Sequence, residues 1–460
     1  MTSSSVPPSS VPASSFSVPP SSVSPERRRR IVDALRRGTV PRQSLDAFAV
    51  GLESLGAAVV EELDAVAGGG AAFKAVRGDY GAGKTFFSRW LQETARRRGF
   101  AAAEVQISET ETPLHRYETV YRRLIERLST PDLDAGALRS VLEGWFYTLE
   151  EDVLAEGEVA EDDAAALASR TDELLERRLA AVTRTAPALA MALRAYRRAV
   201  ASGDREQADG LLAWMSGEPT VGSSIKRPAG LKGEIDHYGA LAFLQGLLVI
   251  LRDSGLPGLV LVLDEVETLQ RVRGDVRERG LNALRQWIDE VDAGRFPGLY
   301  LAITGTPAFY DGPQGVQRLA PLAQRLATAF PSDARFDNPR AVQVRLRAFD
   351  LERLEQVGRR IRDLYAEGRP TRERILTRAD DAYVAELARA VAGELGGRIG
   401  VAPRVFLKKL VAEVLDPLDL HEDFDPRRHY ALTVDAGELT VVERAARGAS
   451  ADVDDVDLEV

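Results

Sequence analysis

The 460-residue sequence contains no cysteine, which excludes disulfide bridges and thiolate metal sites. It has only four histidines, at positions 115, 237, 421 and 429, and their wide separation matches no metal-ligand spacing. It also lacks any run of about 18 apolar residues, so no membrane span is predicted. Because the first residues show no apolar core of a secretory signal peptide either, we expect a cytoplasmic protein.

The charge balance argues against one broad class of function. Acidic residues outnumber basic residues by 70 to 60, which gives a net charge of −10. Such a chain is not expected to coat nucleic acid with its whole surface, although a local basic groove stays compatible with this charge. Hydrophobic residues make up 45% of the sequence and charged residues 28%, the profile of a globular protein. A chain of 460 residues is too long for one compact core, so two or three structural units are expected.

A glycine-rich motif stands between a short apolar segment and a helix-forming segment. It reads G-x-x-x-x-G-K-T, the P-loop or Walker A pattern, and consists of Gly78, Asp79, Tyr80, Gly81, Ala82, Gly83, Lys84 and Thr85. Residues 72–76 before it predict a buried strand, and apolar residues at helical spacing predict a helix over residues 85–98. This strand–loop–helix setting is the one in which the motif binds nucleotide phosphates, so ATP is the predicted ligand.

The residue types of this motif suit phosphate binding. Glycines allow several backbone N–H groups to turn inward around phosphate oxygens, and the N-terminus of the following helix adds partial positive charge. Lys84 is expected to reach the β- and γ-phosphates, and the Thr85 hydroxyl to ligate Mg²⁺. Only six of the 60 basic residues are lysine, so Lys84 indicates a need for a compact ammonium rather than a guanidinium. The alternative is a glycine-rich turn that binds nothing.

An acidic pair follows a second apolar segment. Residues 258–263 predict a strand buried on both faces, and this strand ends at Asp264 and Glu265, which is the Walker B pattern. Asp264 is expected to support Mg²⁺, directly or through water. Glu265 is expected to polarise the attacking water as a general base. Taken alone, the motif also fits an acidic turn without catalytic function.

Further apolar segments alternate with helix-forming ones. Additional strands are predicted at residues 103–107, 299–304 and 342–346. The alternation predicts an α/β fold, with a parallel sheet covered on both faces by helices. Ahead of the P-loop, a helix is predicted from about Ser44, and Val40 and Pro41 are candidates for holding the adenine.

The two motifs are far apart, since 180 residues separate Lys84 from Asp264. A minimal core needs about 40–70 residues there by ordinary element and loop lengths. We interpret the excess as a helical insertion. The predicted organisation is a disordered Ser/Pro-rich tail at 1–25, N-terminal helices with the first part of the ATPase core at 26–130, the helical insertion at 131–233, the second part of the core at 234–348, a helical lid and C-terminal region at 349–445, and an acidic tail at 446–460.

The two motifs, the strand that ends at Thr304 and the helical C-terminal region together resemble the AAA+ P-loop ATPases, in particular their origin-recognition and Cdc6-like branch. More narrowly, the sequence resembles the ATP-binding proteins of BREX-type bacterial phage-defence systems. The narrower resemblance rests on residues 35–41, the P-loop, the long insertion and the segment 423–426. It implies an AAA+-like parallel sheet with a large helical insertion and a helical C-terminal lid.

The AAA+ resemblance implies further site residues. Thr304 would be the polar sensor of the γ-phosphate or the attacking water, with Thr306 as the alternative. Arg404, at the start of a lid helix, stands where a sensor-2 arginine belongs. An arginine finger for a neighbouring subunit's ATP should follow the Thr304 strand, and Arg318 and Arg325 are both candidates. Such a finger implies that the active form is an oligomer.

Two functions fit these observations. The first is an ATPase, converting ATP and water to ADP and phosphate, that acts on or signals about DNA within a phage-defence assembly. The second is a nucleotide-dependent switch or scaffold that controls protein partners with slow turnover. The expected partners are ATP, Mg²⁺, other copies of the chain, other defence-system proteins and double-stranded DNA. Binding to a membrane is not expected. The sequence leaves open the DNA or protein target, the oligomer size, the role of the insertion, the identity of the finger and the turnover rate.

Overall fold

The computed structural model describes residues 22–157, 159–160, 162–395 and 403–435, together with 437, 439 and 444. The tail expected at 1–25 lies outside these residues except for 22–25, and the acidic tail expected at 446–460 lies outside them entirely. The chain divides into two compact units. The sheet unit comprises Glu61–Gly78 and Leu91–Leu346, and the terminal unit comprises Met1–Val60, Asp79–Trp90 and Arg347–Val460.

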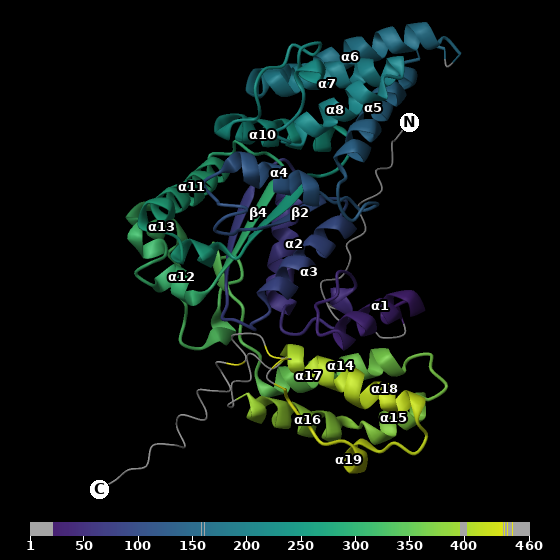
Figure 1. The fold of residues 1–460 in the computed structure, drawn as a ribbon, viewed down its shortest axis with the longest axis vertical. Coiled ribbons are helices and arrows are strands. Elements are labelled where there is room, and N and C mark those ends of the chain that lie inside the picture. The colour runs from purple at the N-terminus through teal and green to yellow at the C-terminus, as the bar shows by residue number, and fades with distance from the viewer. Residues whose placement is uncertain are drawn as a thin grey trace, which may run out of the picture. The chain divides into compact units, whose positions relative to one another are not determined.

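A five-stranded sheet forms the centre of the sheet unit (Figure 1). The strands are β1 (Ala72–Arg77), β2 (Ala101–Gln106), β3 (Leu259–Asp264), β4 (Leu299–Gly305) and β5 (Gln343–Arg345). Their order is β2-β3-β4-β1-β5, and every neighbouring pair is parallel. The structure thus confirms the predicted α/β class with a parallel sheet.

The central strands are continuous apolar runs because helices cover both of their faces. Every residue of β3 and β4 is buried. At their amino ends the two strands approach so closely that an ideal Cβ on Gly258 would lie 2.1 Å from the carbonyl oxygen of Gly298. Only glycine fits at position 258, and the close approach brings the Leu259 N–H within 2.8 Å of the Gly298 carbonyl.

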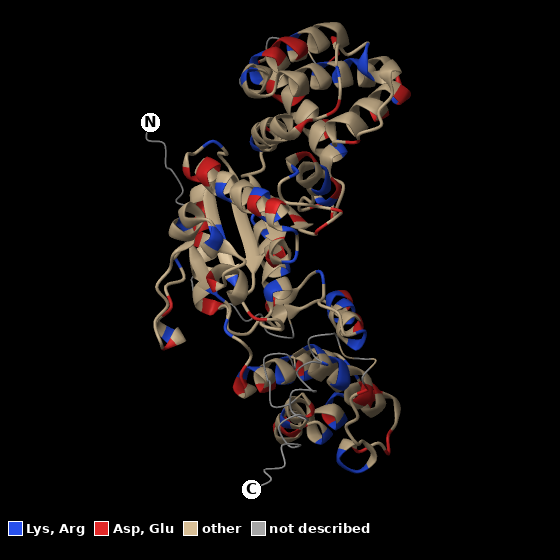
Figure 2. Cartoon of the chain, turned by 60° about the vertical axis from the view of Figure 1, so that its left-hand side comes forward, with Lys and Arg blue, Asp and Glu red and all other residues tan. Residues whose placement is uncertain are grey.

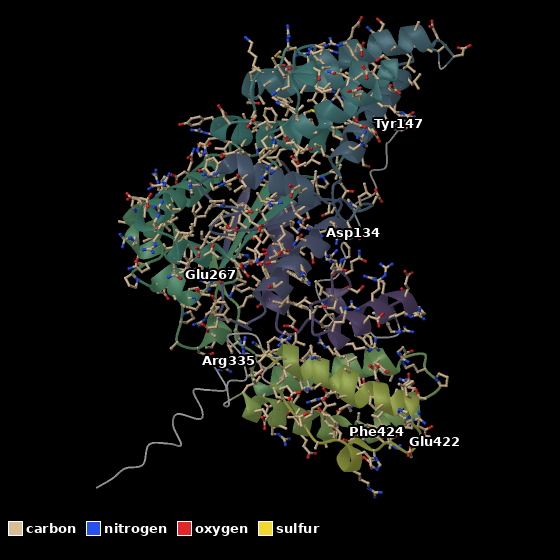
Figure 3. All side chains as sticks on the ribbon, viewed as in Figure 1. Asp134, Tyr147, Glu267, Arg335, Glu422 and Phe424 are labelled. Carbon is tan, nitrogen blue, oxygen red and sulfur yellow. The ribbon has the colours of Figure 1, made fainter. Side chains whose placement is uncertain are left out.

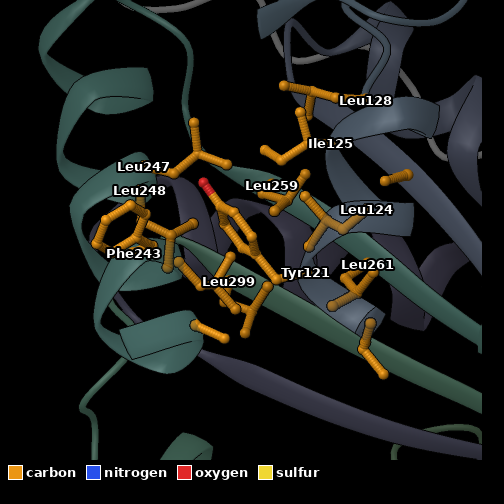
Figure 4. Close-up of a cluster of buried hydrophobic side chains, with 14 of the residues drawn as sticks. Tyr121, Leu124, Ile125, Leu128, Phe243, Leu247, Leu248, Leu259, Leu261 and Leu299 are labelled. Carbon is orange, nitrogen blue, oxygen red and sulfur yellow. The ribbon is translucent and has the colours of Figure 1, made fainter. Parts of the chain in front are cut away.

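Part of the hydrophobic core lies between helices α4 and α10, and Figure 4 shows it in close-up. Tyr121 and Leu124 of α4 face Phe243 and Leu247 of α10 above Leu259 of β3. The helical elements around the sheet, including the 3-10 turns η3 to η5, are α4 (Tyr117–Arg127), α10 (His237–Asp253), η3 (Val266–Gln270), α11 (Gly274–Asp292), α12 (Pro307–Asp311), η4 (Val316–Arg318), α13 (Ala320–Leu326) and η5 (Ala334–Phe336).

A group of helices lies between β2 and α10 in the sequence, and α10 packs against two of them, α5 and α6 (Figure 1). They are α5 (Leu138–Ala155), α6 (Ala164–Thr185), α7 (Pro187–Ser202), α8 (Arg205–Met215) and α9 (Ser223–Lys226). Trp145 and Tyr196 are fully buried in this group. Basic and acidic residues alternate along its helices (Figure 2), and Arg178 forms ion pairs with Asp152 of α5 and Asp253 of α10.

A buried polar network ties β1, β4 and α2 (Glu53–Ala67) together. The Lys74 ammonium, which is almost fully buried, lies 2.5 Å from a Glu62 carboxylate oxygen and donates to the Ala341 carbonyl at 2.9 Å. The Tyr300 hydroxyl donates to the other Glu62 oxygen at 2.7 Å. Burial, with Glu62 as a further cause, raises the pKa of Tyr300 well above its usual value, so the phenol stays a hydrogen-bond donor.

The terminal unit is helical. Its elements are α1 (Pro25–Arg36), η2 (Leu45–Ala47), α14 (Leu351–Ala366), α15 (Arg372–Arg378), α16 (Asp381–Glu394), α17 (Pro403–Lys409), the π-helical turn η7 (Leu410–Leu415), α18 (Asp416–Leu420) and α19 (Pro426–His429). Arg36 binds the Asp416 carboxylate with two hydrogen bonds of 2.6 and 2.8 Å, and this bidentate pair joins α1 to α18. Helix α3 (Lys84–Arg97) begins in this unit and continues into the sheet unit.

The segment 423–426, which carried part of the family resemblance, lies on the surface of α15 and α16. Arg378 donates to the carbonyl oxygens of Glu422 and Phe424, both at 2.6 Å (Figure 3). Arg427 donates to Asp380 at 2.6 Å. These contacts give the segment a structural role in this unit.

The predicted start of the helix at Ser44 is wrong, because α2 begins only at Glu53. Ser44 has a φ of 65°, in the left-handed region, and only the short turn η2 follows it before α2 starts at Glu53. The apolar spacing of Phe48 and Leu52 suggested a helix, but Gly51, with a φ of 76°, also interrupts this segment. Among the described residues, no helix is long and apolar enough to cross a membrane.

We predict opposite effects of two glycine-to-alanine substitutions on stability. Gly258→Ala should lower the free energy of unfolding by about 1–3 kcal/mol, because its Cβ would collide with the Gly298 carbonyl. Gly144→Ala, at an exposed position of α5 with nothing within 4 Å of the new Cβ, should raise that free energy by about 0.5–1 kcal/mol. Urea denaturation followed by circular dichroism measures both changes. Equal stability of the Gly258→Ala variant and the parent would contradict the packing argument.

Candidate functional site

The carboxyl ends of the strands meet at one edge of the sheet, because all five strands run in the same direction. Ligands of open parallel sheets bind at this edge. The Gly78 N–H, directly after β1, donates to the Gly305 carbonyl at 3.0 Å. The first residue of the predicted phosphate loop therefore lies beside the end of β4.

Three of the predicted residues form a hydrogen-bonded group at this edge. The Thr304 hydroxyl, on fully buried β4, donates to Oδ1 of Asp264 at the end of β3. The Glu265 N–H donates to the same Oδ1 at 3.1 Å and lies 3.3 Å from the Thr304 hydroxyl oxygen. Asp264 is only 5% exposed, so these two donors fix the position of its carboxylate.

Glu265 has an unusual backbone conformation. Its φ of 60° and ψ of 40° lie in the left-handed region, which only Ser44 shares among the described non-glycine residues. For a residue with a Cβ, this conformation costs of order 1–3 kcal/mol and is common at functional sites. It directs the chain away from β3 immediately after Asp264, which turns Glu265 toward β2.

Gln106 holds the Glu265 side chain, and the sequence analysis missed it. Its Nε2 donates to a Glu265 carboxylate oxygen at 2.9 Å. Gln106 is the last residue of β2, which pairs with β3 so that Gln106 stands opposite Asp264. A polar residue near the end of a strand predicted at 103–107 was the available signal, but the sequence did not show that this strand neighbours β3.

In the terminal unit, the predicted phosphate loop leads directly into α3. Gly81 and Gly83 have φ values of 83° and 91°, where side chains are strained, so glycine is needed at both positions. Lys84 is the first residue of α3, and its ammonium lies 3.4 Å from the Asp79 carbonyl and 4.9 Å from the centre of the Tyr80 ring. Thr85, the next residue of α3, is exposed.

Two further predicted segments belong to the same unit. Arg89 of α3 donates to the carbonyl of Val40, so residues 40–41 lie beside the helix that follows the loop. Arg404, the second residue of α17, lies near Gly38: an ideal Cβ on that glycine would be 3.3 Å from the Arg404 guanidinium. The terminal unit thus brings Val40 to the loop helix and Arg404 to the segment just before Val40.

The two candidate finger arginines differ in their surroundings. Arg325 of α13 forms an ion pair with Asp289 of α11 and donates to the Pro321 carbonyl at 2.9 Å. Arg318 ends η4 and is exposed, and within the part of the chain that the structure describes its side chain has no recorded partner. Arg325 is therefore engaged inside its own sheet unit, whereas Arg318 is available to another molecule.

The donor set of the predicted site suits a cation that brings most of its own ligands. Among the described residues, no group of three or more His, Asp or Glu could hold a metal. A hydroxyl at Thr85 and a carboxylate at Asp264 are what Mg²⁺ requires from the protein when phosphates and water supply the rest. Thr85 belongs to the terminal unit and Asp264 to the sheet unit, so their joint binding of Mg²⁺ stays a prediction.

No curated protein and no solved structure matches the chain. A family model does: that of the BREX system ATP-binding proteins BrxC/D, which matches residues 23–434. The match contains every predicted site residue, from Val40 to Arg404, and it confirms the narrower of the two resemblances seen in the sequence. The chain therefore belongs to the family of BREX system ATP-binding proteins BrxC/D.

Proposed function

We propose that this protein binds and hydrolyses ATP at an AAA+-type P-loop site, as part of a BREX phage-defence assembly. The strand order is the main support. Strand β4 lies between β1 and β3, so Thr304 stands between the start of the phosphate loop and the acidic pair. This order supports the proposal, because the first residue of the loop, the proposed sensor and the acidic pair follow neighbouring strands of one sheet.

The residues after β1 would bind the nucleotide. The loop 78–83 offers backbone N–H groups to the phosphates, Lys84 neutralises the β- and γ-phosphates, and the first turn of α3 adds its partial positive charge. Val40 and Pro41, which Arg89 joins to α3, would contact the adenine. Arg404 would contact the γ-phosphate side as a sensor from the helical C-terminal region.

The residues after β3 would carry out hydrolysis. Mg²⁺, held by Thr85 and Asp264, would neutralise charge on the transferred phosphoryl group. Glu265 would take the proton of the attacking water as a general base. Gln106 positions the Glu265 carboxylate, and Thr304 positions Asp264 and senses the γ-phosphate. Thr304 suits this role better than Thr306, because Thr304 contacts Asp264 whereas Thr306 directly precedes α12.

The domain division proposed from the sequence gives each part a task. Residues 26–130 and 234–348 would form the ATPase core, 131–233 a helical insertion, and 349–445 the lid, between a tail at 1–25 and an acidic tail at 446–460. The insertion carries 18 acidic and 12 basic residues. Its excess of negative charge suits a protein partner better than a nucleic-acid backbone.

We propose Arg318 as the arginine finger, which requires an oligomer. It lies beyond the β4 strand on the exposed turn η4, and Arg325 is occupied by Asp289. A guanidinium supplied in trans would stabilise charge on the phosphoryl group of a neighbouring subunit's ATP.

The second candidate function, a nucleotide switch with slow turnover, is favoured by ion pairs of arginines that stand close to other arginines in the sequence, at 96–98 and 359–374. The clusters that could grip DNA are largely neutralised within the chain. Arg96 pairs with Asp134, Arg98 with Asp64, Arg362 with Asp381 and Arg369 with Asp419. Paired arginines contribute little to phosphate binding unless their partners move away.

Two substitutions should separate ATP binding from hydrolysis. Lys84→Ala should abolish ATP binding, because it removes the cation for the β- and γ-phosphates. Glu265→Gln should retain ATP binding and lose about 10²–10⁴-fold in turnover, the usual contribution of a general base. Gln106→Ala should lower turnover in the same direction without loss of affinity. Isothermal titration and phosphate release measure the two properties; normal hydrolysis by Glu265→Gln would refute the assigned acidic pair.

The two finger candidates make a matched pair. Arg318→Ala should reduce turnover of the assembled protein by about 10³–10⁵-fold, as expected for loss of a finger, and leave ATP affinity unchanged. Arg325→Ala should have a much smaller effect on turnover, because Arg325 serves an internal ion pair. The proposal fails if Arg318→Ala hydrolyses ATP at the parent rate in steady-state assays at concentrations where the protein is assembled.

Hydrolysis with and without double-stranded DNA at low salt distinguishes the two functions. Strong stimulation by DNA, lost as salt rises, would favour a DNA-acting ATPase. Tight ATP binding with turnover that is indifferent to DNA would favour the switch, as the paired arginines lead us to expect. Glu265→Gln is the control for contaminating ATPase activity.

A further inference from the structure

We propose that Arg277 is a positioning residue that links the acidic end of β3 to the segment carrying Arg318. This inference rests on the proposed function of both sites. Arg277 belongs to α11, and neither motif of the sequence includes it. Its guanidinium contacts two segments that are otherwise separate in the sequence, the turn after Glu265 and the loop before Arg318.

The contacts to the first segment are directed at backbone carbonyls. Nε of Arg277 donates to the Leu269 carbonyl at 3.1 Å, and Nη2 donates to the carbonyls of Gln270 and Val272, both at 2.9 Å. These carbonyls belong to the end of η3 and the residues after it, so Arg277 satisfies acceptors that the turn itself leaves open. Since η3 begins immediately after Glu265, Arg277 fixes the exit of the chain from the acidic pair.

The same guanidinium reaches the second segment through its remaining nitrogen. Nη1 donates to the side-chain oxygen of Gln314, four residues before Arg318. A second link runs parallel to it, because Nε2 of Gln270 donates to the Ala308 carbonyl of α12 at 3.0 Å. One planar fork therefore holds both segments at once, which an ammonium could not do with the same geometry.

The turn η3 is packed against its neighbours, so a displacement at the acidic end of β3 can shift the segments beside it. Gly280 of α11 leaves room for Leu269: an ideal Cβ on Gly280 would lie 2.5 Å from a Leu269 methyl carbon. Glu267 is buried and lies beside α12 (Figure 3), where burial raises the pKa of Tyr310 and Glu267 adds to this increase. Helix α11, η3 and α12 thus form one packed group.

The segment that carries Arg318 has less support on its other side. It folds back tightly on α12, since an ideal Cβ on Gly315 would lie 1.9 Å from the Phe309 carbonyl oxygen. Beneath it lies a cavity of about 430 Å³, lined among others by Arg77, Val316, Leu326 and Gln343. Val316 of this segment is buried in the core, and the polar contacts through Gln314 and Gln317, which donates to the Tyr310 carbonyl at 2.8 Å, add to its support.

A purely structural role for Arg277 would be to close the end of η3. The hydrogen bond from Arg277 to Gln314 distinguishes this structural role from a positioning role. This bond does not stabilise η3 and acts only on the segment that carries Arg318. Arg279, on the same helix, is the matched control: it donates to Asp275 within α11, at 3.0 Å, and its side chain is 58% exposed.

Mixed oligomers test the proposal in trans. Lys84→Ala subunits cannot bind ATP but carry Arg318, and Arg318→Ala subunits keep their own site but offer no finger. Mixing them should restore hydrolysis; if it does not, the trans finger of the proposed function fails. Arg277→Gln added to the Lys84→Ala subunits should then reduce the restored turnover by about 10–100-fold, since a 1 Å misplacement can cost about 100-fold. Arg279→Gln in the same subunits should leave it unchanged.

Equal restored turnover with Arg277→Gln and Arg279→Gln in the finger-donating subunit would overturn the inference. Gln314→Ala in that subunit keeps every carbonyl contact of Arg277 and should reduce turnover in the same direction, even if Arg277→Gln lowers the melting temperature. Combining Gln314→Ala with Arg277→Gln should add little to the larger single effect, because both remove one link. Full additivity of the two losses would also contradict a shared link.

Discussion

The common direction of the five strands is the constraint on which the rest of this structure depends. Because every strand ends at the same edge, Gly78, Asp264 and Thr304 come together although more than 200 residues separate the first from the last. Apolar runs in β3 and β4, buried on both faces, make this arrangement stable. The close approach of Gly258 and Gly298 at the opposite edge fixes where the two central strands begin.

Polar contacts at the carboxyl edge then fix the orientation of the side chains that the strands bring together there. Thr304 and the Glu265 N–H hold Asp264, and Gln106 holds Glu265 from the neighbouring strand. The left-handed backbone at Glu265 stores strain that these contacts compensate. A carboxylate held in this way would need little reorganisation to act as the general base that we propose.

Ion pairs within the chain reduce the number of arginines that are available to bind another molecule. Several arginines hold helices together through ion pairs, as Arg36 does with Asp416 and Arg362 with Asp381. Two of the six lysines differ from these arginines, since Lys74 and Lys84 are buried at positions where a compact ammonium meets carbonyl or carboxylate oxygens. An arginine without such a partner, such as Arg318, is therefore the more informative exception.

The sequence by itself determined the parallel α/β fold and the family. Continuous apolar runs indicate strands that are buried on both faces, and the two motifs are patterns of consecutive residues that can be read without the structure. It predicted Lys84, Asp264, Glu265 and Thr304 as a set. Only the tertiary structure decided that β4 lies between β1 and β3, that Gln106 meets Glu265, and that Arg325 is occupied while Arg318 is not. It also showed that Ser44 turns the chain instead of starting a helix. These features depend on contacts between residues distant in sequence, and no local pattern of residue types encodes which strands or side chains become neighbours.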